Sequence, residues 1–599
     1  MNKEIHIQSG ELADAIRIGG RAAAQPIVFN RTIGLFQRAD ADHPGSTAVL
    51  FASPWGLEEL CTHKFWRIIA EKLAETGIPS FRFDWPGTGD ALDDGDFSRG
   101  LAVWSDALVA GAGLLKDLSG CQRIIVLSQG LGCVVAADAA ARMDGLEAIA
   151  FMAPVVSGRH YTRELAIWSG MVDADLGLPE AQRDKTGVSI ASLKLPAEVA
   201  EGLRRANLMT LGSKIAAECL VLVRVDRPSD REFAAHLSQL GMDTVTEDYT
   251  SYDKLVSNPV ISQLPLAVAD RIVDWAAGVA GRSPPIEARA LVVQDVKAGT
   301  LQGDGFAETP LRFGRGDRLY GVLCEPQGTR RGATVLFLTS AYDRHAGWGR
   351  TIVTIARALA RRGVASLRFD TANASDSPPV PGVPDQVLYH DAQNADVAEA
   401  LSFLNGLGTA AIIAAGRCSG AYLGFQSIVA DPRLSGAVLV NPITFYWEPG
   451  RSVDEAVREG SRTLEEYGSR LLRASTFKRL VRGELDFVGI ARNVAGGMGR
   501  RIAKRARHLL RGRTIEGRAV YKAFGVLKDR QSPVELLYSY RDPGLEYFGY
   551  YFDAREGRIA GYPNVSVKKI TDADHNLTPQ HARDIYIDAL ERMALRFPG

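Results

Sequence analysis

Short apolar-rich runs alternate with segments of helical periodicity along most of the chain, and one such series occurs in each half. Each run has the length of a buried strand, and an amphipathic segment that ends at Gly77 or Gly363 separates the first two runs of each series. The runs are 47–51, 80–84, 124–127 and 148–152 in the first half, and 333–337, 366–370, 412–415 and 437–440 in the second. This alternation predicts α/β architecture, with a mostly parallel, doubly wound sheet in each half.

The two halves also resemble each other in sequence, at an offset of about 286 residues. The segment 80–84, SFRFD, corresponds to 366–370, SLRFD. A repeat of this length predicts two tandem copies of one domain. We expect the first domain at 1–277, a linker rich in glycine and proline at 278–290, and the second domain at 291–599.

Each half carries an insertion after its last run, at 153–217 and 442–532, where a helical cap over an active site is expected. The second insertion contains a basic cluster formed by Arg500, Arg501, Lys504, Arg505 and Arg507. Such a cluster is typical of a solvated helix face. The alternative is a site for an anionic lipid headgroup, nucleotide or polysaccharide, including peripheral contact with an anionic membrane.

A cysteine stands where a strand meets a helix in the second half. The segment 416–420, GRCSG, follows the apolar run 410–415 and precedes a helix-like stretch. Strand, sharp turn and helix together are typical of a nucleophile elbow, whose flanking glycines avoid collisions with neighbouring backbone. Cys418 is therefore the candidate nucleophile, and it needs a base and an acid to react as a thiolate.

The other members of a catalytic triad follow Cys418 in the order acid, histidine. Asp542 follows a strand-like segment, with Asp553 nearby as a second acid, and His575 lies between the last strand-like segment and the final helix-like segment. On position, we expect Asp542 to orient His575, and His575 to hold Cys418 as a thiolate.

The backbone N–H groups of Ser419 and Ala341 are the expected donors of an oxyanion hole. Ser419 directly follows the nucleophile, and Ala341 lies after the first strand of the second half. His345 is close to that loop, where a surface position is the simpler interpretation and contact with substrate the alternative.

The first half contains a related turn, but fewer of the residues that a catalytic triad requires. Ser128 lies in the segment 126–130, VLSQG, where an elbow is expected, and Asp226 follows a strand-like segment as the candidate acid. No histidine occurs between His236 and His345, where the base should lie. Because a serine nucleophile requires its base, we expect a degenerate site in a domain that binds substrate or a partner, or supports the second half.

Composition excludes several other classes of function. The 599 residues include 70 basic and 70 acidic ones, so the charge balance indicates no nucleic-acid partner. The six cysteines lack C-x-x-C spacing, which favours a reducing compartment. The chain has neither a signal-like apolar segment at its start nor a run of about 18 apolar residues, so we expect a cytoplasmic protein. Without a metal-binding or nucleotide-binding motif, no cofactor is expected.

The residues around both turns resemble the α/β-hydrolase superfamily, in its serine-aminopeptidase-like and dienelactone-hydrolase-like branch. The resemblance covers about 45–275 and 318–597, and the loop 83–90, FDWPGTGD, resembles the superfamily's D-x-x-G-x-G-x-S motif. It implies tandem α/β-hydrolase domains and ester, thioester or amide chemistry through a covalent acyl-enzyme, without a cofactor. The segments 154–165 and 476–486 are similar to hydrolases of bacterial exopolysaccharide and exosortase loci.

Together these observations predict a cytoplasmic hydrolase of ester or thioester bonds, with Cys418, His575 and Asp542 as its triad. Its expected substrate is a small-molecule, glycan or lipid acyl compound, and the resemblance links it to exopolysaccharide biosynthesis. Two alternatives stay open. The thioester intermediate also suits an acyltransferase that acts on a glycan or lipid, and two inactive sites would leave a binding or scaffold protein.

Overall fold

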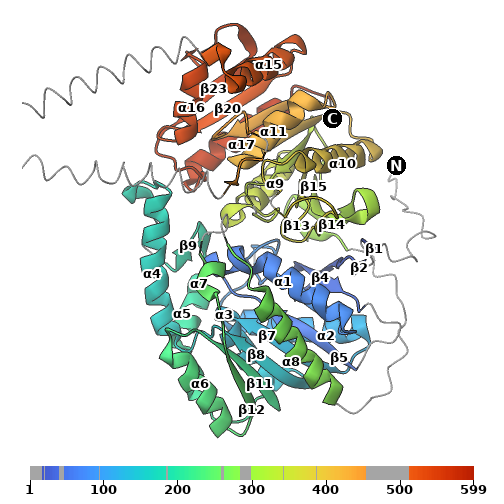
Figure 1. Cartoon of the computed structure of the whole chain (residues 1–599), viewed down its shortest axis with the longest axis vertical. Coiled ribbons are helices and arrows are strands. Elements are labelled where there is room, and N and C mark those ends of the chain that lie inside the picture. The colour runs from blue at the N-terminus through green and yellow to red at the C-terminus, as the bar shows by residue number, and fades with distance from the viewer. Residues whose placement is uncertain are drawn as a thin grey trace, which may run out of the picture.

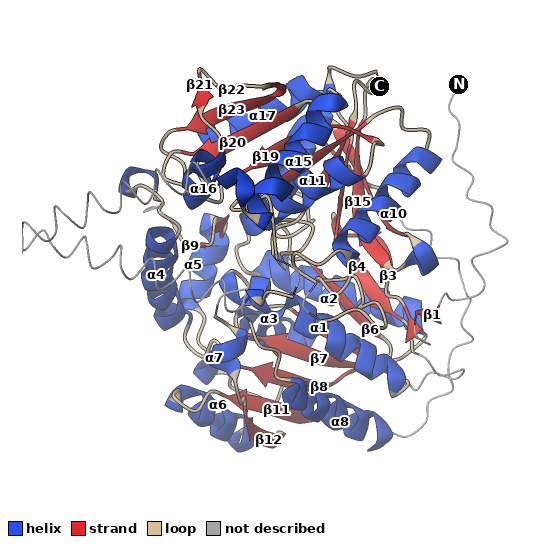
Figure 2. Ribbon diagram, turned by 45° about the horizontal axis from the view of Figure 1, so that its top comes forward, coloured by secondary structure: helices blue, strands red, loops and turns tan. Residues whose placement is uncertain are grey.

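The computed structural model describes most of the chain, and Figure 1 shows two domains, one above the other. The described residues are 17–18, 21–39, 46–93, 95–183, 187–257, 262–282, 299–341, 343–385, 387–448, 450–453 and 511–598. Each apolar-rich run singled out in the sequence falls on a strand. The two sheets, with helices on both faces, confirm the predicted α/β architecture with a mostly parallel sheet in each half (Figure 2).

The N-terminal domain is built on an eight-stranded sheet in the order β12-β11-β8-β7-β5-β6-β4-β3. Its strands are β3 (Gln25–Phe29), β4 (Thr32–Gln37), β5 (Thr47–Ala52), β6 (Ser80–Phe83), β7 (Arg123–Gln129), β8 (Leu146–Met152), β11 (Glu218–Val223) and β12 (Asp243–Asp248). From β6 to β12 neighbouring strands are parallel, and β4 pairs antiparallel with both β3 and β6. The carboxyl ends of the parallel strands therefore meet at one edge, where α/β proteins bind ligands.

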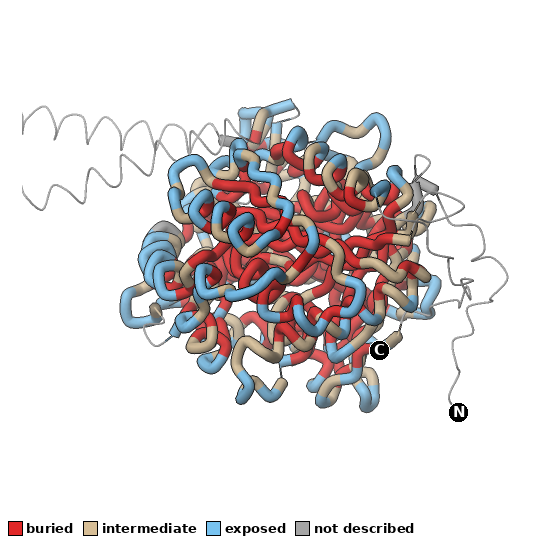
Figure 3. The backbone as a smooth tube through the Cα atoms, turned by 90° about the horizontal axis from the view of Figure 1, so that it is seen from below, coloured by how far each residue is buried: buried red, intermediate tan, exposed pale blue. Residues whose placement is uncertain are grey.

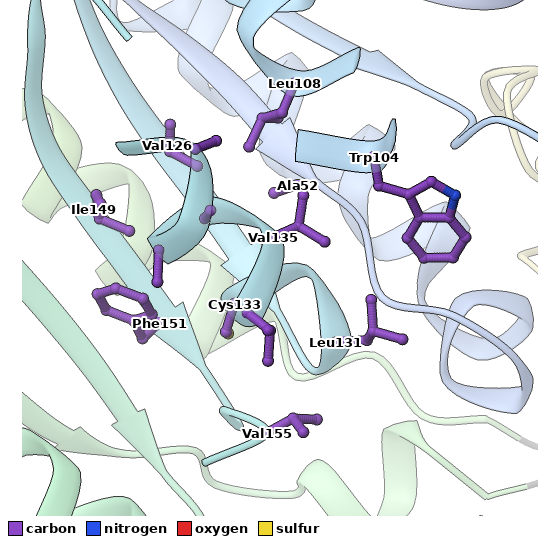
Figure 4. Packing of buried hydrophobic residues seen from close by; sticks show 14 of the residues in the cluster. Ala52, Trp104, Leu108, Val126, Leu131, Cys133, Val135, Ile149, Phe151 and Val155 are labelled. Carbon is purple, nitrogen blue, oxygen red and sulfur yellow. The ribbon is translucent and has the colours of Figure 1, made fainter. Parts of the chain in front are cut away.

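Strand β5 shows why helices cover both faces of this sheet. Val49 and Phe51 point into one apolar cluster and Leu50 and Ala52 into the other, as the two-residue period of a strand requires. The covering helices are α1 (Leu57–Glu75) and α8 (Leu266–Arg282) on one face, and α2 (Ala102–Ser119), α3 (Leu131–Ala139) and α6 (Pro228–Gln239) on the other. Figure 4 shows the second cluster, in which α3 packs between strand residues such as Val126 and residues of α2.

The C-terminal domain repeats this plan in an 11-stranded sheet, in the order β13-β14-β15-β17-β16-β18-β19-β20-β23-β22-β21. The central parallel strands are β17 (Ser366–Phe369), β16 (Thr334–Leu338), β18 (Ile412–Arg417), β19 (Leu434–Val440), β20 (Val534–Ser539) and β23 (Tyr562–Ile570). The antiparallel edge strands are β13 (Leu301–Gly303), β14 (Phe306–Phe313) and β15 (Leu319–Pro326) at one end, and β22 (Arg558–Ile559) and β21 (Ala554–Arg555) at the other.

Helices again cover both faces of the C-terminal sheet. They are α9 (Thr351–Arg361) and α17 (Gln580–Ala594) on one face, and α10 (Ala392–Gly406), α11 (Ser419–Ala430), α15 (Ile515–Asp529) and α16 (Pro543–Tyr551) on the other. Helix α15 falls inside the predicted cap 442–532, but its Val520 and Phe524 are buried in the core of the domain. That end of the insertion therefore belongs to the domain body, and the basic cluster at 500–507 lies outside the described residues.

The N-terminal insertion folds over the carboxyl edge of its sheet as a cap. It comprises α4 (Gly158–Asp175), the hairpin of β9 (Ser189–Ile190) and β10 (Leu193–Lys194), and α5 (Ala197–Arg205). The hairpin also reaches the second domain, where Ser192 Oγ lies 2.9 Å from Thr578 Oγ1. This contact brings the N-terminal cap close to the loop that carries His575.

The two domains share part of their apolar core. Ile33 and Leu35 of β4 belong to the same buried cluster as Phe306 and Tyr320 of the C-terminal domain. Figure 3, in which the molecule is seen from below, shows buried backbone in the middle and exposed backbone mainly at the rim. Helix α8 continues to Arg282, so the segment 278–282 is helical rather than part of a linker. Among the described helices, none is both long and apolar enough to cross a bilayer.

Candidate active site

Cys418 lies at a strained turn between β18 and α11. Its backbone is at φ 54° and ψ −121°, and residues that carry a side chain rarely adopt such a positive φ. The two flanking glycines are required by close packing, because a Cβ on Gly416 would lie 2.3 Å from the carbonyl oxygen of Gly420. A Cβ on Gly420 would lie equally close, 2.3 Å, to the carbonyl oxygen of Leu338. The segment therefore has the geometry of a nucleophile elbow.

Asp542 and His575 lie together at the same edge of the sheet. Asp542 is the N-cap of α16, where its Oδ1 accepts the N–H of Gly544 at 2.8 Å. Its other oxygen, Oδ2, lies 2.5 Å from Nδ1 of His575. The Asp542 side chain is 1% exposed and the His575 side chain 24%, so the acid is shielded while the imidazole is accessible. Asp553 is not the partner of His575 in this structure.

The loop that carries His575 is fixed by backbone contacts. Asn441, which follows β19, donates from Nδ2 to the carbonyl oxygen of His575 at 2.9 Å. Ser539 Oγ donates to the carbonyl oxygen of Asp574 at 2.7 Å, and Asp574 Oδ1 accepts the N–H of Thr578 at 2.6 Å. These bonds tie the loop to the ends of β19 and β20, so the imidazole position is set by the sheet.

The thiol of Cys418 and the imidazole of His575 are hydrogen-bonded to each other. Burial raises the pKa of the Cys418 thiol, but the charge and hydrogen bond of His575 outweigh it, so the pKa of Cys418 lies below its usual value. Burial lowers the pKa of His575, but the Cys418 thiolate and the Asp542 carboxylate raise the pKa of His575 to about 10. Each of the two side chains therefore favours the charged form of the other.

Two backbone N–H groups lie at the elbow and in the loop beside it. The N–H of Ser419 hydrogen-bonds Cys418 itself. Ala341, at φ 49°, donates its N–H to the hydroxyl oxygen of Ser419 at 2.6 Å. In this structure the N–H of Ala341 is therefore already bonded to the Ser419 hydroxyl. Rotation of that hydroxyl would leave the N–H of Ala341 available to an oxyanion. Ser340 Oγ donates to the carbonyl oxygen of Arg417 at 2.6 Å and links this loop to the elbow.

An aromatic wall lies next to the nucleophile and was not predicted from the sequence. Tyr422 is one turn along α11, with its N–H on the carbonyl oxygen of Cys418 at 3.1 Å. Tyr389 packs edge-on against Tyr422 and stacks on Trp447, with ring centroids 4.9 Å and 4.1 Å apart. The position of Tyr422, one helical turn after Cys418, was a usable signal. Tyr389 and Trp447 come from distant loops, and no local pattern marks them.

The N-terminal domain has its elbow at Gly130, and the prediction of Ser128 is wrong by two positions. Gly130 has the same backbone angles as Cys418, φ 54° and ψ −121°, and directly precedes α3. Ser128 is still inside β7, where it is fully buried and donates to the carbonyl oxygen of Ala150 at 2.6 Å. Ser128 stands where the C-terminal turn has Gly416, so only the second flanking glycine, Gly132, is present, and the sequence left the register of the turn undefined. This domain therefore has no nucleophilic side chain at its elbow.

A buried carboxyl group fills the place of the missing nucleophile. A Cβ on Gly130 would lie 2.2 Å from Oε2 of Glu58. The other oxygen of Glu58 accepts from Nε2 of Gln129 at 2.9 Å and from the hydroxyl of Tyr252 at 3.0 Å. Burial raises the pKa of Glu58, although Gln129, Arg224 and Tyr252 act in the opposite direction. The pocket of the N-terminal site is thus closed by its own side chains.

The predicted acid of the N-terminal site lies outside it. The side chain of Asp226 is 82% exposed, and its nearest ionic partner is Arg227 at 3.9 Å. Arg227 is the N-cap of α6 and is followed by a proline, as Asp542 is before α16. Arginine therefore stands where the C-terminal domain has its acid. Within the described residues there is also no cluster of three histidine, cysteine or acidic side chains that could hold a metal ion.

Comparisons with known proteins give structural similarity only. No protein-family model matches the chain, and no curated protein matches it in sequence. Among solved structures, it is similar to a dienelactone hydrolase from Anabaena variabilis, at 11% identity and a TM-score of 0.30 over 49% of this chain and 100% of that one. It is also similar to an esterase from Pyrococcus furiosus, at 16% identity and a TM-score of 0.31, over 49% of this chain and 92% of that one. The functional interpretation therefore rests on the geometry of the site.

Proposed function

We propose that the C-terminal domain hydrolyses ester or thioester bonds through Cys418, His575 and Asp542. The observation that carries this proposal is the pairing of Cys418 with His575 at a strained elbow, with Asp542 Oδ2 2.5 Å from the far nitrogen of the imidazole. Arginine at the acid position and glycine at the elbow exclude the same chemistry from the N-terminal domain.

In the first half of the proposed reaction, the Cys418 thiolate attacks the carbonyl carbon of the substrate and forms a tetrahedral oxyanion. The N–H groups of Ser419 and Ala341 would stabilise the negative oxygen. As the intermediate collapses, the bond to the leaving group breaks, and Nε2 of His575 gives its proton to the departing oxygen or sulfur. The product is a thioester on Cys418.

In the second half, His575 takes a proton from water, and the resulting hydroxide attacks the thioester carbonyl. The carbon–sulfur bond breaks, the carboxylic acid leaves, and the thiolate is restored beside the reprotonated imidazole. Asp542 holds the imidazole in one orientation in both halves. An alcohol that replaced this water would receive the acyl group, so transfer to a glycan or lipid hydroxyl is the alternative outcome of the same intermediate.

The aromatic wall supports a substrate with a planar or ring-shaped part. Tyr389 and Trp447 are stacked with an interplanar angle of 10°, and the guanidinium of Arg451 lies 5.2 Å from the centroid of the Trp447 ring. Such a surface suits a sugar ring or an aromatic acyl group. A glycan-linked ester, in keeping with the resemblance to exopolysaccharide-locus hydrolases, is therefore the substrate class that we propose.

Turnover of p-nitrophenyl acetate and S-phenyl thioacetate by the full chain tests this function. We expect Cys418→Ala to lower kcat/KM by at least about 10³-fold, because the nucleophile is lost. Cys324→Ala is the matched control, since Cys324 is a fully buried thiol of the same domain, and it should keep nearly all activity. Full activity in Cys418→Ala would refute the proposal. Product analysis with glycerol present separates hydrolysis from acyl transfer.

A further inference from the structure

The two domains contact each other through a pseudo-symmetric set of arginine–aspartate pairs. Arg82 on β6 pairs with Asp376 of the C-terminal domain. Arg368, at the equivalent place on β17, pairs with Asp90 of the N-terminal domain, its Nη2 lying 3.0 Å from Oδ1. Each domain therefore inserts an acidic loop beside an arginine of the other, as in a homodimer with a two-fold axis.

Each of these two aspartates also contacts a histidine of the other domain. Nε2 of His63 lies 2.8 Å from Asp376, and Nε2 of His345 lies 2.6 Å from Asp90. His345 is completely buried, so the expectation of a surface or substrate-contacting histidine is wrong. Its partner Asp90 is far away in the sequence, which is why no local pattern indicated burial.

The two histidines differ in the segment of the chain that carries them. His63 lies on α1, a helix that carries none of the catalytic side chains. His345 belongs to the loop after β16, shortly after Ala341. The side chain of the neighbouring Arg344 also reaches the N-terminal domain, where its two terminal nitrogens lie 2.7 and 2.9 Å from the two oxygens of Asp84. An arginine–carboxylate pair with two parallel contacts of this kind is bidentate, and it is stronger and more directional than an ion pair with a single contact.

The oxyanion loop is therefore anchored in both domains. Within its own domain His345 is held by Asp370, which accepts its backbone N–H at 2.6 Å and lies 3.2 Å from Nδ1. The His345 ring also packs edge-on against Tyr320 of the same domain. The other hydrogen bonds of the Arg344 and His345 side chains are to Asp84, Asp90 and Glu59 of the N-terminal domain. Ala341, at a strained positive φ, requires a surrounding structure that fixes it.

We propose that the N-terminal domain positions the oxyanion loop of the C-terminal active site. Asp84 and Asp90 hold Arg344 and His345, and through them they aim the N–H of Ala341 at the oxyanion. This inference rests on the proposed function. It gives the domain without a nucleophile a defined role, namely to organise the oxyanion hole of its duplicate.

Two reactions of Cys418 separate this role from general stability. Alkylation by iodoacetamide needs the thiolate but no oxyanion hole, whereas turnover of p-nitrophenyl acetate needs both. In the full chain, Asp84→Asn and Arg344→Lys should each lower kcat by about 10-fold or more, with KM and the alkylation rate within about twofold of wild type. Arg67→Lys is the matched control, because Arg67 Nε donates across the domain interface to the carbonyl oxygen of Ser375 at 2.8 Å, away from this loop, and it should change neither rate.

Hydrogen exchange of the peptide 339–350 tests the positioning without reference to activity. We expect faster exchange in Asp84→Asn and Arg344→Lys, and unchanged exchange in the control Arg67→Lys. Equal losses of activity in Asp84→Asn and Arg67→Lys, or unchanged exchange in Asp84→Asn, would overturn the inference. Absence of turnover in the wild-type chain would instead count against the proposed function, and the exchange result would still decide the positioning role.

Discussion

At the scale of single residues, the environment of a thiol decides whether it reacts. Burial raises the pKa of Cys133 to about 12, and the same cause raises the pKa of Cys61 to about 12. Cys418 is also surrounded by protein, but the imidazolium of His575 lowers its pKa. The difference between Cys418 and the other buried thiols therefore lies mainly in the charge and hydrogen bond of His575, with a smaller contribution from Arg417.

Substitution of His575 should move the pH dependence of alkylation. In the wild-type chain the pKa of Cys418 is lowered from 9.0, so the midpoint of the pH–rate profile with iodoacetamide should lie below pH 9.0. In His575→Gln, burial remains and the largest opposing charge is gone, so the midpoint should rise and the rate at pH 7 should fall by about 10-fold or more. A pH–rate profile with peptide mapping measures this. An unchanged midpoint would show that His575 does not stabilise the thiolate.

At the scale of elements, both domains build the same turn but fill it differently. The strand-to-helix turns at Gly130 and Cys418 share their backbone angles, because the same sheet and helix packing surround both. In the N-terminal domain Glu58, from α1, occupies the space beside the turn. The architecture is present in both copies, whereas the candidate triad is present in one.

A cysteine placed at the N-terminal turn should not create a second active site. In Gly130→Cys the new Cβ would lie 2.2 Å from Oε2 of Glu58, so the variant should melt at a lower temperature and its introduced thiol should stay unreactive toward iodoacetamide. Gly113→Cys is the matched control, because Gly113 is exposed on α2 with no atom within 4 Å of a new Cβ. The control should be stable and readily alkylated. Rapid alkylation at position 130 would contradict the closed pocket.

The sequence predicted those features that depend on local pattern. The G-x-C-x-G turn located the elbow at Cys418, and the order of strands placed Asp542 and His575 at its edge. Ser128 was misplaced because only the last glycine of the pattern is present there, and a turn without both glycines does not define its own register. The role of Glu58 could not be predicted, since it depends on contacts between residues distant in the sequence.

At the scale of the whole molecule, the chain is a duplicated domain that packs on itself. Asp90 and Asp376 each accept a hydrogen bond from an arginine or histidine of the other domain. Charges buried in this way are costly when left unpaired, so each domain depends on the other to compensate them. The pairing follows from the shared SFRFD and SLRFD segments, but a repeat alone does not reveal that its copies face each other.

The central claim is that one cysteine of the whole chain forms a covalent acyl intermediate. Rapid mixing with p-nitrophenyl acetate, acid quenching, intact-mass measurement and peptide mapping test it most directly. We predict a single acetyl adduct on Cys418 that is absent from His575→Ala, with no adduct on Ser128, which is fully buried, or on Cys133. An adduct on any other residue, or none on Cys418 while ester is being consumed, would contradict the account.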